Sequence, residues 1–276
     1  MLELTDKELD ILINIMYNAT GVLLRSTKKN LVINRLRGRI QELKLNSFSE
    51  YIKILNENNN QEINVFINQI TTNETFFFRH TVHFNYLYET ILPQLEFSTK
   101  KNNNKNIRLW SAASSTGEEP YSIAVICKEY FKNKPLFSFD ILASDVNSEV
   151  IVKAMEAKYT ERSMRETPKS IIDKYFITTA TAKSNNNLTF SPITEIKKAI
   201  KFINHNLLNT LTQKPFDVVF LRNALIYFDT ESKKKVLNNI HKIINDGGYL
   251  FLGLSEGIND NEGQFKFIHS GIYRKE

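Results

Sequence analysis

From about residue 105 onward, short apolar runs alternate with amphipathic segments, and this alternation restricts the possible folds more than any other feature. Apolar runs predict strands, with helical patterns among them, over residues 107–112, 139–143, 216–221, 249–254 and 265–273. Strands that alternate with helices pair mainly in parallel, because each helix returns the chain to the start of the next strand. The pattern therefore predicts an α/β fold with a mainly parallel, doubly wound sheet.

The first seventy residues show a different, helical pattern. Thr5 with Glu8 is a capping-box pair, and Ser47 with Glu50 repeats it ahead of further apolar residues at helical spacing. We expect a helical N-terminal domain over residues 1–70, a linker over 71–90 and the α/β domain over 91–276.

Two polar stretches interrupt the α/β pattern. Residues 99–106 predict a surface loop. Residues 177–200 contain a Ser- and Asn-rich piece at 184–187 between short extended runs, and they predict a small insertion outside the sheet.

The excess of positive over negative charge lies in one segment of the chain. The net charge is +6, and residues 25–44, with seven basic side chains and one acidic side chain, account for all of it. The helical stripe of Ile33, Leu36, Ile40 and Leu43 places Lys28, Arg35 and Arg39 on a different, solvent-facing side. Such a face could bind an acidic partner, or it could serve only solubility.

Several features point to a cytoplasmic protein that is not inserted in a membrane. The single cysteine, Cys127, excludes an internal disulfide and fits a reducing compartment. No apolar run approaches the roughly 20 residues that cross a bilayer, and the acidic start does not match a signal peptide. His80 and His83 have no third ligand nearby in the sequence, so we predict no metal site.

The segment from Ala112 to Glu119 leaves a predicted strand and begins a helix. Its small residues let a ligand approach the backbone, and the helix N-terminus offers free N–H groups. The adjacent Glu118 and Glu119 oppose a pyrophosphate and suit a cationic ligand. Alternatively, Thr116 and Glu119 could form a capping box with no ligand at all.

Asp145 ends the next predicted strand, where a carboxylate can bind ribose hydroxyls. It could also serve only as a helix cap. Together the loop and Asp145 favour a cationic cofactor that contains adenosine, which is S-adenosylmethionine. The glycine fingerprints of NAD enzymes and of nucleoside triphosphatases are absent.

Four blocks of sequence resemble the CheR-type chemoreceptor glutamate methyltransferases and occur in that family's order: residues 71–79 (TTNETFFFR), 110–124 (WSAASSTGEEPYSIA), 143–145 (ASD) and 216–228 (FDVVFLRNALIYF). The resemblance implies a small helical domain followed by a seven-stranded, Rossmann-like methyltransferase domain with a small antiparallel β-subdomain inserted near 177–200. It also implies that glutamate side chains of membrane chemoreceptors are methylated from S-adenosylmethionine, with S-adenosylhomocysteine as product.

Matched by position, the resemblance implies a set of cofactor-binding residues: Asn73, Thr75, Arg79, Glu118, Glu119, Asp145, Asn206, Leu207, Leu221 and Arg222. We favour Glu119 over Glu118 as the partner of the methionine part. Arg79 and Tyr227 are implied as the catalytic residues, although Tyr227 could be merely a buried phenol. Phe76 and Leu221 depart from the family's usual residues, and we expect at least two of Phe76, Phe77 and Phe78 to be simply buried.

On this basis Lys28, Arg35 and Arg39 are expected to dock on the acidic, helical cytoplasmic bundle of chemoreceptors. The alternatives are a non-catalytic S-adenosylmethionine sensor and a methyltransferase of another protein or of nucleic acid. A nucleic-acid amino-methyltransferase usually carries Asn/Asp-Pro-Pro-Tyr where this chain has Arg222-Asn223-Ala224-Leu225. We therefore expect no nucleic-acid partner.

Overall fold

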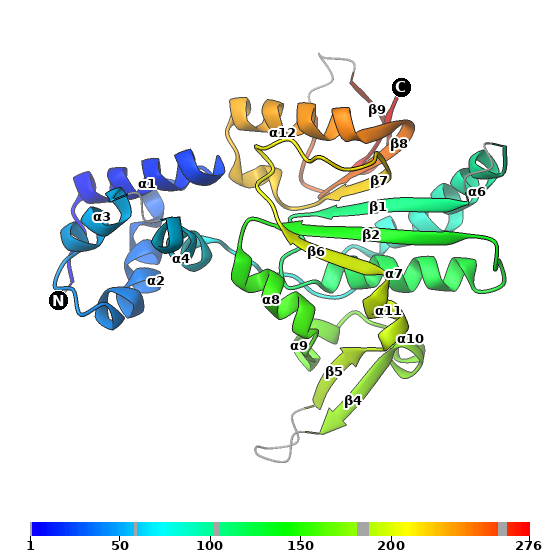
Figure 1. Ribbon diagram of the computed structural model, residues 1–276, viewed down its shortest axis with the longest axis horizontal. Coiled ribbons are helices and arrows are strands. Elements are labelled where there is room, and N and C mark those ends of the chain that lie inside the picture. The colour runs from blue at the N-terminus through cyan, green and yellow to red at the C-terminus, as the bar shows by residue number, and fades with distance from the viewer. Residues whose placement is uncertain (1, 58–59, 102–104, 181–187, 259–263) are drawn as a thin grey trace.

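The N-terminal part of the chain is all-helical in the computed structural model, which describes residues 2–57, 60–101, 105–180, 188–258 and 264–276. Its elements are α1 (Asp6–Thr20), the 3-10 turn η1 (Ser26–Lys28), α2 (Lys29–Glu42), α3 (Phe48–Asn56) and α4 (Asn60–Ile70). The predicted caps are confirmed: the Thr5 side chain accepts the Glu8 N–H, and the Ser47 side chain accepts the Glu50 N–H. These helices bury one apolar cluster of their own and lie beside the sheet (Figure 1). We call them the helical module.

Further helical segments connect the module to the α/β part: α5 (Thr81–Tyr86), the π-helix η2 (Leu87–Ile91) and α6 (Leu92–Lys101). Residues 81–90 of the predicted linker are therefore helical, because Phe84, Leu87 and Ile91 are buried in the same core as the sheet. The predicted polar loop at 99–106 is also shorter than expected. Residues 99–101 belong to α6, residue 106 begins the first strand, and residues 102–104 lie outside the described ranges.

Within the described ranges the main sheet has seven strands, in the order β6-β2-β1-β7-β8-β10-β9. They are β1 (Asn106–Ala112), β2 (Ser138–Asp145), β6 (Ile200–Asn204), β7 (Phe216–Leu221), β8 (Ile244–Leu252), β9 (Phe265–His269) and β10 (Ile272–Lys275). The strands from β6 to β8 are parallel, and β10 is antiparallel to both its neighbours. The predicted doubly wound α/β fold is confirmed.

Helices cover both faces of this sheet, as the nearly continuous apolar strands require. The helices α7 (Glu118–Phe131) and α8 (Ser148–Glu156) lie on one side and α12 (Thr230–Ile243) on the other (Figure 1). Ile123 of α7 belongs to one core cluster and Val236 of α12 to another, so the sheet separates two cores. Asp229 caps α12 by accepting the Ser232 N–H.

A small antiparallel sheet of order β3-β5-β4 lies beside the main sheet in the part of the chain that the structure describes. Its region comprises β3 (Tyr159–Thr160), α9 (Glu161–Met164), α10 (Lys169–Tyr175), β4 (Phe176–Ala180), β5 (Leu188–Pro192) and α11 (Thr194–Lys198). It begins earlier than the predicted insertion at 177–200, because β3 is too short to give a sequence pattern. Residue 200 already opens β6, and the Ser- and Asn-rich piece at 184–187 lies outside the described residues.

The end of the chain differs from the prediction in two places. The helix α12 ends at Ile243, and β8 begins at once, because Ile244 is buried and pairs with Phe216. Tyr249, near which the sequence predicts this strand to begin, is therefore the sixth residue of β8. The Asp246-Gly247-Gly248 stretch before it lies at an irregularity of the pairing, where Gly247 has a φ of 74°. Residues 265–273 form parts of two strands, β9 and β10, and not one. No helix of the described residues is long and apolar enough to span a membrane.

Candidate active site

The carboxyl ends of β1, β2, β6 and β7 meet at the sheet edge that faces the helical module (Figure 1). The strand order reverses at β1, which pairs with β2 on one side and with β7 on the other. Ligands of open parallel sheets bind in the crevice at such a reversal. A cavity of about 550 Å³ lies here, and its wall includes Met16 and Thr20 of α1 as well as the loops that follow the four strands.

The loop after β1 forms one wall of the cavity. Ala113, Ser115 and Gly117 all have left-handed backbone conformations, with φ of 61°, 48° and 96°. A Cβ on Gly117 would lie 2.9 Å from both Ala154 Cβ and Tyr159 Oη, so the close packing of this turn requires glycine. Gly117 is the N-cap of α7 and no side chain caps it. The capping box between Thr116 and Glu119 is therefore wrong as an explanation of these residues.

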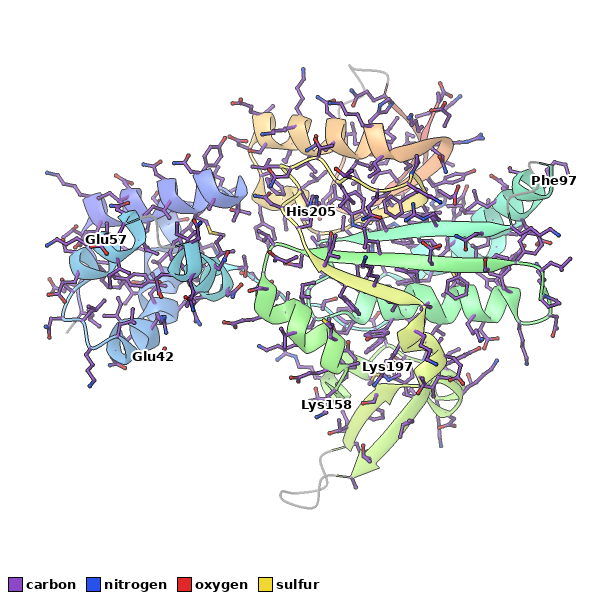
Figure 2. The ribbon with its side chains drawn as sticks, viewed as in Figure 1. Glu42, Glu57, Phe97, Lys158, Lys197 and His205 are labelled. Carbon is purple, nitrogen blue, oxygen red and sulfur yellow. The ribbon has the colours of Figure 1, made fainter. Side chains whose placement is uncertain are left out.

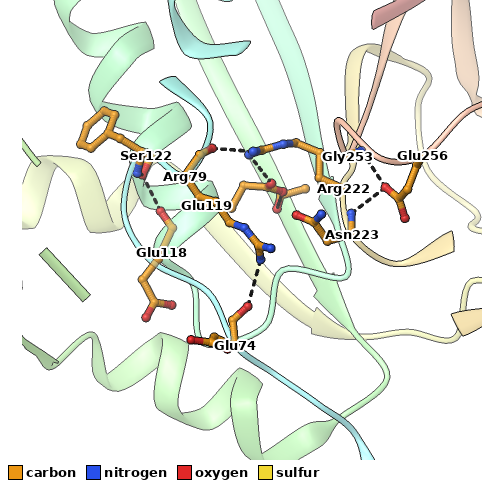
Figure 3. Close-up of polar contacts among 11 residues, drawn as sticks. Glu74, Arg79, Glu118, Glu119, Ser122, Arg222, Asn223, Gly253 and Glu256 are labelled. Atoms are coloured by element: carbon orange, nitrogen blue, oxygen red, sulfur yellow. Dashed lines mark hydrogen bonds and ion pairs between the residues drawn. The ribbon is translucent and has the colours of Figure 1, made fainter. Parts of the chain in front are cut away.

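The two neighbouring glutamates have different surroundings. The Glu119 carboxylate lines the cavity and accepts a hydrogen bond from the Ser111 hydroxyl at 2.8 Å. It also accepts one from Arg222 Nη1 at 3.0 Å (Figure 3). Burial raises the pKa of Glu119, and the charge of Arg222 opposes that rise. The Glu118 carboxylate lies outside the cavity lining and accepts the hydroxyls of Thr116 and Ser163. The structure thus brings Glu119, and not Glu118, to the cavity.

Arg222 follows β7 and is almost fully buried, with 2 % of its side chain exposed. Its Nη2 donates to the backbone carbonyl of Arg79, so it joins Glu119 to the segment at residues 71–79. Its Nε has no partner among the described residues.

Asp145 ends β2, as predicted, and it also lines the cavity. Its carboxylate accepts the N–H of Ser115 at 2.8 Å and the N–H of Asn147 at 2.9 Å. Burial raises its pKa, and these amide donors oppose the rise. Asp145 therefore ties the β1 loop to the end of β2 while one side of it faces the cavity.

The segment at residues 71–79 forms a second wall, to which Asn73, Thr75 and Arg79 contribute. The Arg79 guanidinium donates to the Glu74 carbonyl at 3.1 Å and remains partly exposed (Figure 3). Phe77 and Phe78 are buried in the core, which confirms that at least two of the three phenylalanines are structural.

The remaining predicted cofactor residues come from the loop after β6 and from β7. Asn206 and Leu207 line the cavity, and the Asn206 side-chain amide donates to the Ala19 carbonyl of the helical module at 2.8 Å. Leu221 is fully buried within β7 and lies outside the lining.

Tyr227 lies on the 3-10 turn η3 (Leu225–Tyr227), lines the cavity and is 38 % exposed. The alternative that it is only a buried phenol is therefore wrong. Its carbonyl accepts the Leu23 N–H at 2.7 Å, and the next residue, Phe228, forms a β-bridge with Val22. The helical module thus contacts the segment that carries Tyr227.

The expectation that Lys28, Arg35 and Arg39 share a solvent-facing side is wrong for the two arginines. Arg35 Nη1 donates to the carbonyls of Ile70 and Thr71, at 2.5 and 2.7 Å, and Arg39 is paired with the buried Glu62. Only Lys28 of the three is exposed. Lys28 and Arg35 line the cavity, so the basic segment also borders the site.

Sequence reasoning missed two residues of this region. His205, which is labelled in Figure 2, follows β6 and lines the cavity. Its ring packs edge-on against Trp110, with 6.1 Å between the ring centroids. Glu256, which follows β8, binds backbone amides of the loop that carries Tyr227. The signal for Glu256 was the same as for Asp145, a carboxylate just beyond the end of a predicted strand.

Among the described residues no group of His, Cys, Asp and Glu side chains is arranged to hold a metal ion. Burial lowers the pKa of both His80 and His83 to about 4, so both rings are neutral at pH 7. The His83 ring lies 3.0 Å from the Ser270 carbonyl.

Both domains of the chain match models of a known protein family. Residues 7–71 match the all-alpha domain of CheR methyltransferases, and residues 73–274 match their S-adenosylmethionine (SAM) binding domain. The chain belongs to the CheR methyltransferase family. Membership in a methyltransferase family confirms the resemblance and gives no support to the non-catalytic sensor.

Similar proteins match over nearly the full chain. A chemotaxis protein methyltransferase of Borreliella burgdorferi is 34 % identical over 278 residues, which cover 99 % of this chain and 96 % of that protein. Chemotaxis protein methyltransferase 2 of Vibrio cholerae is 33 % identical, and the match covers 88 % of this chain and 83 % of that protein. The Escherichia coli chemotaxis protein methyltransferase is 29 % identical, and the match covers 99 % of this chain and 92 % of that protein.

The cofactor of this CheR methyltransferase is S-adenosylmethionine, and the residues present fit it. The ligand carries a sulfonium and an ammonium group, and the cavity presents the carboxylates of Glu119 and Asp145. Apolar side chains such as Val146 and Leu207 suit its adenine ring.

Proposed function

We propose that this enzyme methylates glutamate side chains in the cytoplasmic helical bundle of membrane chemoreceptors, giving glutamate methyl esters and S-adenosylhomocysteine. The observation that carries the proposal is the shared cavity: Arg79 and Tyr227, from separate segments, line it together with Glu119 and Asp145. The relatives are chemotaxis protein methyltransferases, which supports a chemoreceptor substrate and hence a cytoplasmic site of action.

The reaction needs little acid–base catalysis. A glutamate carboxylate with a pKa near ~4.3 is already ionised at neutral pH and is itself the nucleophile. When bound, S-adenosylmethionine supplies a methyl group activated by its sulfonium. The protein must therefore align the carboxylate oxygen with this methyl group and exclude water from it.

The cavity residues have distinct proposed roles. Asp145 accepts hydrogen bonds from the ribose hydroxyls, and Glu119 pairs with the ammonium group of the methionine part. Asn73, Thr75, Asn206 and Leu207 complete the cofactor site, because all four line the same cavity. Two of the predicted residues have a structural role behind the cavity wall. Leu221 is buried within β7, and Glu118 accepts the hydroxyls of Thr116 and Ser163.

Arg79 and Tyr227 act on the substrate side. The Arg79 guanidinium attracts and orients the glutamate carboxylate through a charge-assisted hydrogen bond. The Tyr227 hydroxyl adds a neutral hydrogen bond, which positions the carboxylate without reducing its nucleophilicity as strongly as a second cation would.

Docking of the acidic receptor surface is assigned to Lys28, which is exposed at the cavity wall. Arg25 lies beside it, is also exposed and also lines the cavity. Arg35 and Arg39 are assigned to the stability of the helical module, because Arg35 donates to the Ile70 carbonyl and Arg39 pairs with Glu62. Long-range attraction between such cations and an acidic surface raises the association rate.

The test is methyl transfer from labelled S-adenosylmethionine to chemoreceptor membranes and, in parallel, to nucleic acid. We expect label in the receptor that alkali releases as methanol, since a methyl ester hydrolyses in alkali. Label in the nucleic acid, or alkali-stable label in the receptor, would refute the proposed substrate.

A further inference from the structure

We infer that Glu256 is a positioning residue for methyl transfer, which acts by holding the segment that carries Tyr227. This inference rests on the proposed function, because it concerns the step in which Tyr227 acts. Glu256 does not line the cavity, so it acts through other residues.

The Glu256 carboxylate joins two loops that leave neighbouring strands. Its Oε2 accepts the N–H of Asn223 at 2.7 Å, in the loop after β7, and the N–H of Gly253 at 2.6 Å, directly after β8 (Figure 3). Its Oε1 accepts the N–H of Ile226 at 3.2 Å. Hydrogen bonds to an ionised carboxylate are stronger than those between neutral groups, so these contacts hold the loop after β7 against the end of β8.

The loop that Glu256 holds has a backbone that needs support. Asn223 lies in the left-handed region with a φ of 60°, which costs a residue with a side chain some free energy. Asn223 also lines the cavity, and Ile226 directly precedes Tyr227. Bonds to the amides of residues 223 and 226 therefore hold both ends of the short stretch that leads to the Tyr227 side chain.

Gly253 provides an independent observation on the same contact. A Cβ at this position would lie 2.6 Å from Glu256 Oε2 and 2.7 Å from Asn223 Nδ2. The absence of a side chain at residue 253 is what lets the carboxylate reach both loops. Gly253→Ala should therefore displace the carboxylate while Glu256 itself stays unchanged.

Tyr227 is held from the other side by the helical module, since its carbonyl accepts the Leu23 N–H at 2.7 Å. The phenol thus projects from a segment anchored on one side by Glu256 and on the other by the module. Misplacement of a positioning group by about 1 Å can lower a rate by roughly 100-fold.

The experiment compares Glu256→Ala, Glu256→Gln and Gly253→Ala with wild type at saturating cofactor and receptor. We expect Glu256→Ala to lower kcat by about 10- to 100-fold while the affinity for S-adenosylhomocysteine, measured by calorimetry, changes less than about threefold. Glu256→Gln keeps one acceptor oxygen and should give an intermediate kcat. In a Tyr227→Phe background, Glu256→Ala should lower kcat far less than it does in wild type, because both substitutions affect the same hydrogen bond from Tyr227 to the substrate.

A matched control is Asp217→Ala, at the opposite end of the same strand, β7. Asp217 also accepts a backbone N–H, that of Arg108 at 2.8 Å, so its loss costs stability without touching the Tyr227 loop. Wild-type kcat in Glu256→Ala, an equal loss of kcat in Asp217→Ala, or full additivity with Tyr227→Phe would each overturn the inference.

Amide hydrogen exchange separates this inference from the proposed function, because it needs no substrate. We expect faster exchange at Asn223, Ile226 and Gly253 in Glu256→Ala than in wild type, and unchanged exchange there in Asp217→Ala. Unchanged exchange in Glu256→Ala would refute the anchoring role. Failure of the wild-type enzyme to methylate receptors would instead refute the proposed function.

Discussion

The Glu119 carboxylate and the Arg222 guanidinium meet at 3.0 Å in a buried wall of the cavity, although 103 residues separate them in the chain. Burial of both groups makes their pairing necessary, because an uncompensated charge in such a place costs several kcal/mol. The same carboxylate faces the cavity. Glu119 therefore holds Arg222 in place and presents a negative charge to the cationic cofactor.

The first prediction concerns pH. Burial raises the pKa of Glu119 above its ordinary value of 4.5, so in the free protein this carboxylate takes up a proton at a higher pH than an exposed glutamate. Only the ionised form pairs with the ammonium of S-adenosylhomocysteine, and calorimetric affinity should fall as the pH is lowered through the raised pKa.

Glu119→Gln should bind S-adenosylhomocysteine about 10-fold or more weakly at pH 7, since a hydrogen bond to a charged group is lost. Its affinity should also vary less with pH. The raised pKa means that the folded free protein binds this proton more tightly than the unfolded chain, so protonation of Glu119 does not itself unfold the protein. An unchanged pH profile in Glu119→Gln would exclude the assigned role.

Arg79→Ala should nearly abolish methyl transfer, by about 100-fold or more, because the substrate carboxylate loses its orienting cation. The matched control is Arg162→Ala. Arg162 contacts the same residue, Glu74, but through an exposed ion pair at 3.0 Å, and such pairs contribute about 0–1 kcal/mol. Steady-state rates on receptor membranes should separate the two variants, and equal rates would argue against Arg79.

Tyr227→Phe should lower kcat by about 10-fold or more and leave the affinity for S-adenosylhomocysteine nearly unchanged, since the phenol positions the substrate and not the cofactor. Tyr88→Phe serves as the control, because Tyr88 is exposed to a similar extent, 41 % against 38 %. A loss confined to cofactor affinity would assign Tyr227 to the cofactor site instead.

Arg39→Ala should destabilise the protein by about 3 kcal/mol in urea unfolding, since it removes the charge that compensates the buried Glu62 carboxylate. Arg37→Ala, on the exposed side of the same helix, should change stability by less than about 0.5 kcal/mol. Similar stabilities for the two variants would show that the pair with Glu62 contributes little.

Lys28→Glu should reduce kcat/KM on receptor membranes, and the reduction should shrink as salt is raised, because screening weakens attraction between exposed charges. Lys44→Glu makes the same change of charge at an exposed position just after α2. Equal effects of both variants would mean that net charge, and not a docking site beside the cavity, governs association.

The sequence predicted what depends on local pattern. The strand ends at Ala112, Asp145 and Leu221 were readable because apolar runs stop there, and these ends set the position of the cavity. The short β3 and the irregularity at Gly247 were not predicted, since neither has a periodic pattern long enough to read.

The predictions for the site that were wrong depend on contacts between segments distant in the sequence. Helical spacing separates Arg35 from the apolar stripe, but it cannot show that the Arg35 guanidinium donates to the carbonyls at the end of α4. Likewise the hydrogen bond from the Asn223 N–H to the Glu256 carboxylate joins residues 33 positions apart and follows only from the order of β7 and β8 in the sheet.

The central claim is that this cavity transfers a methyl group to a glutamate carboxylate oriented by Arg79. The most direct measurement is peptide mass spectrometry of a chemoreceptor cytoplasmic fragment after incubation with S-adenosylmethionine and either wild-type enzyme or Arg79→Ala. The account predicts one added methyl group on particular glutamate side chains with the wild type, and almost none with the variant. Methylation of another residue type, or equal methylation by Arg79→Ala, would contradict it.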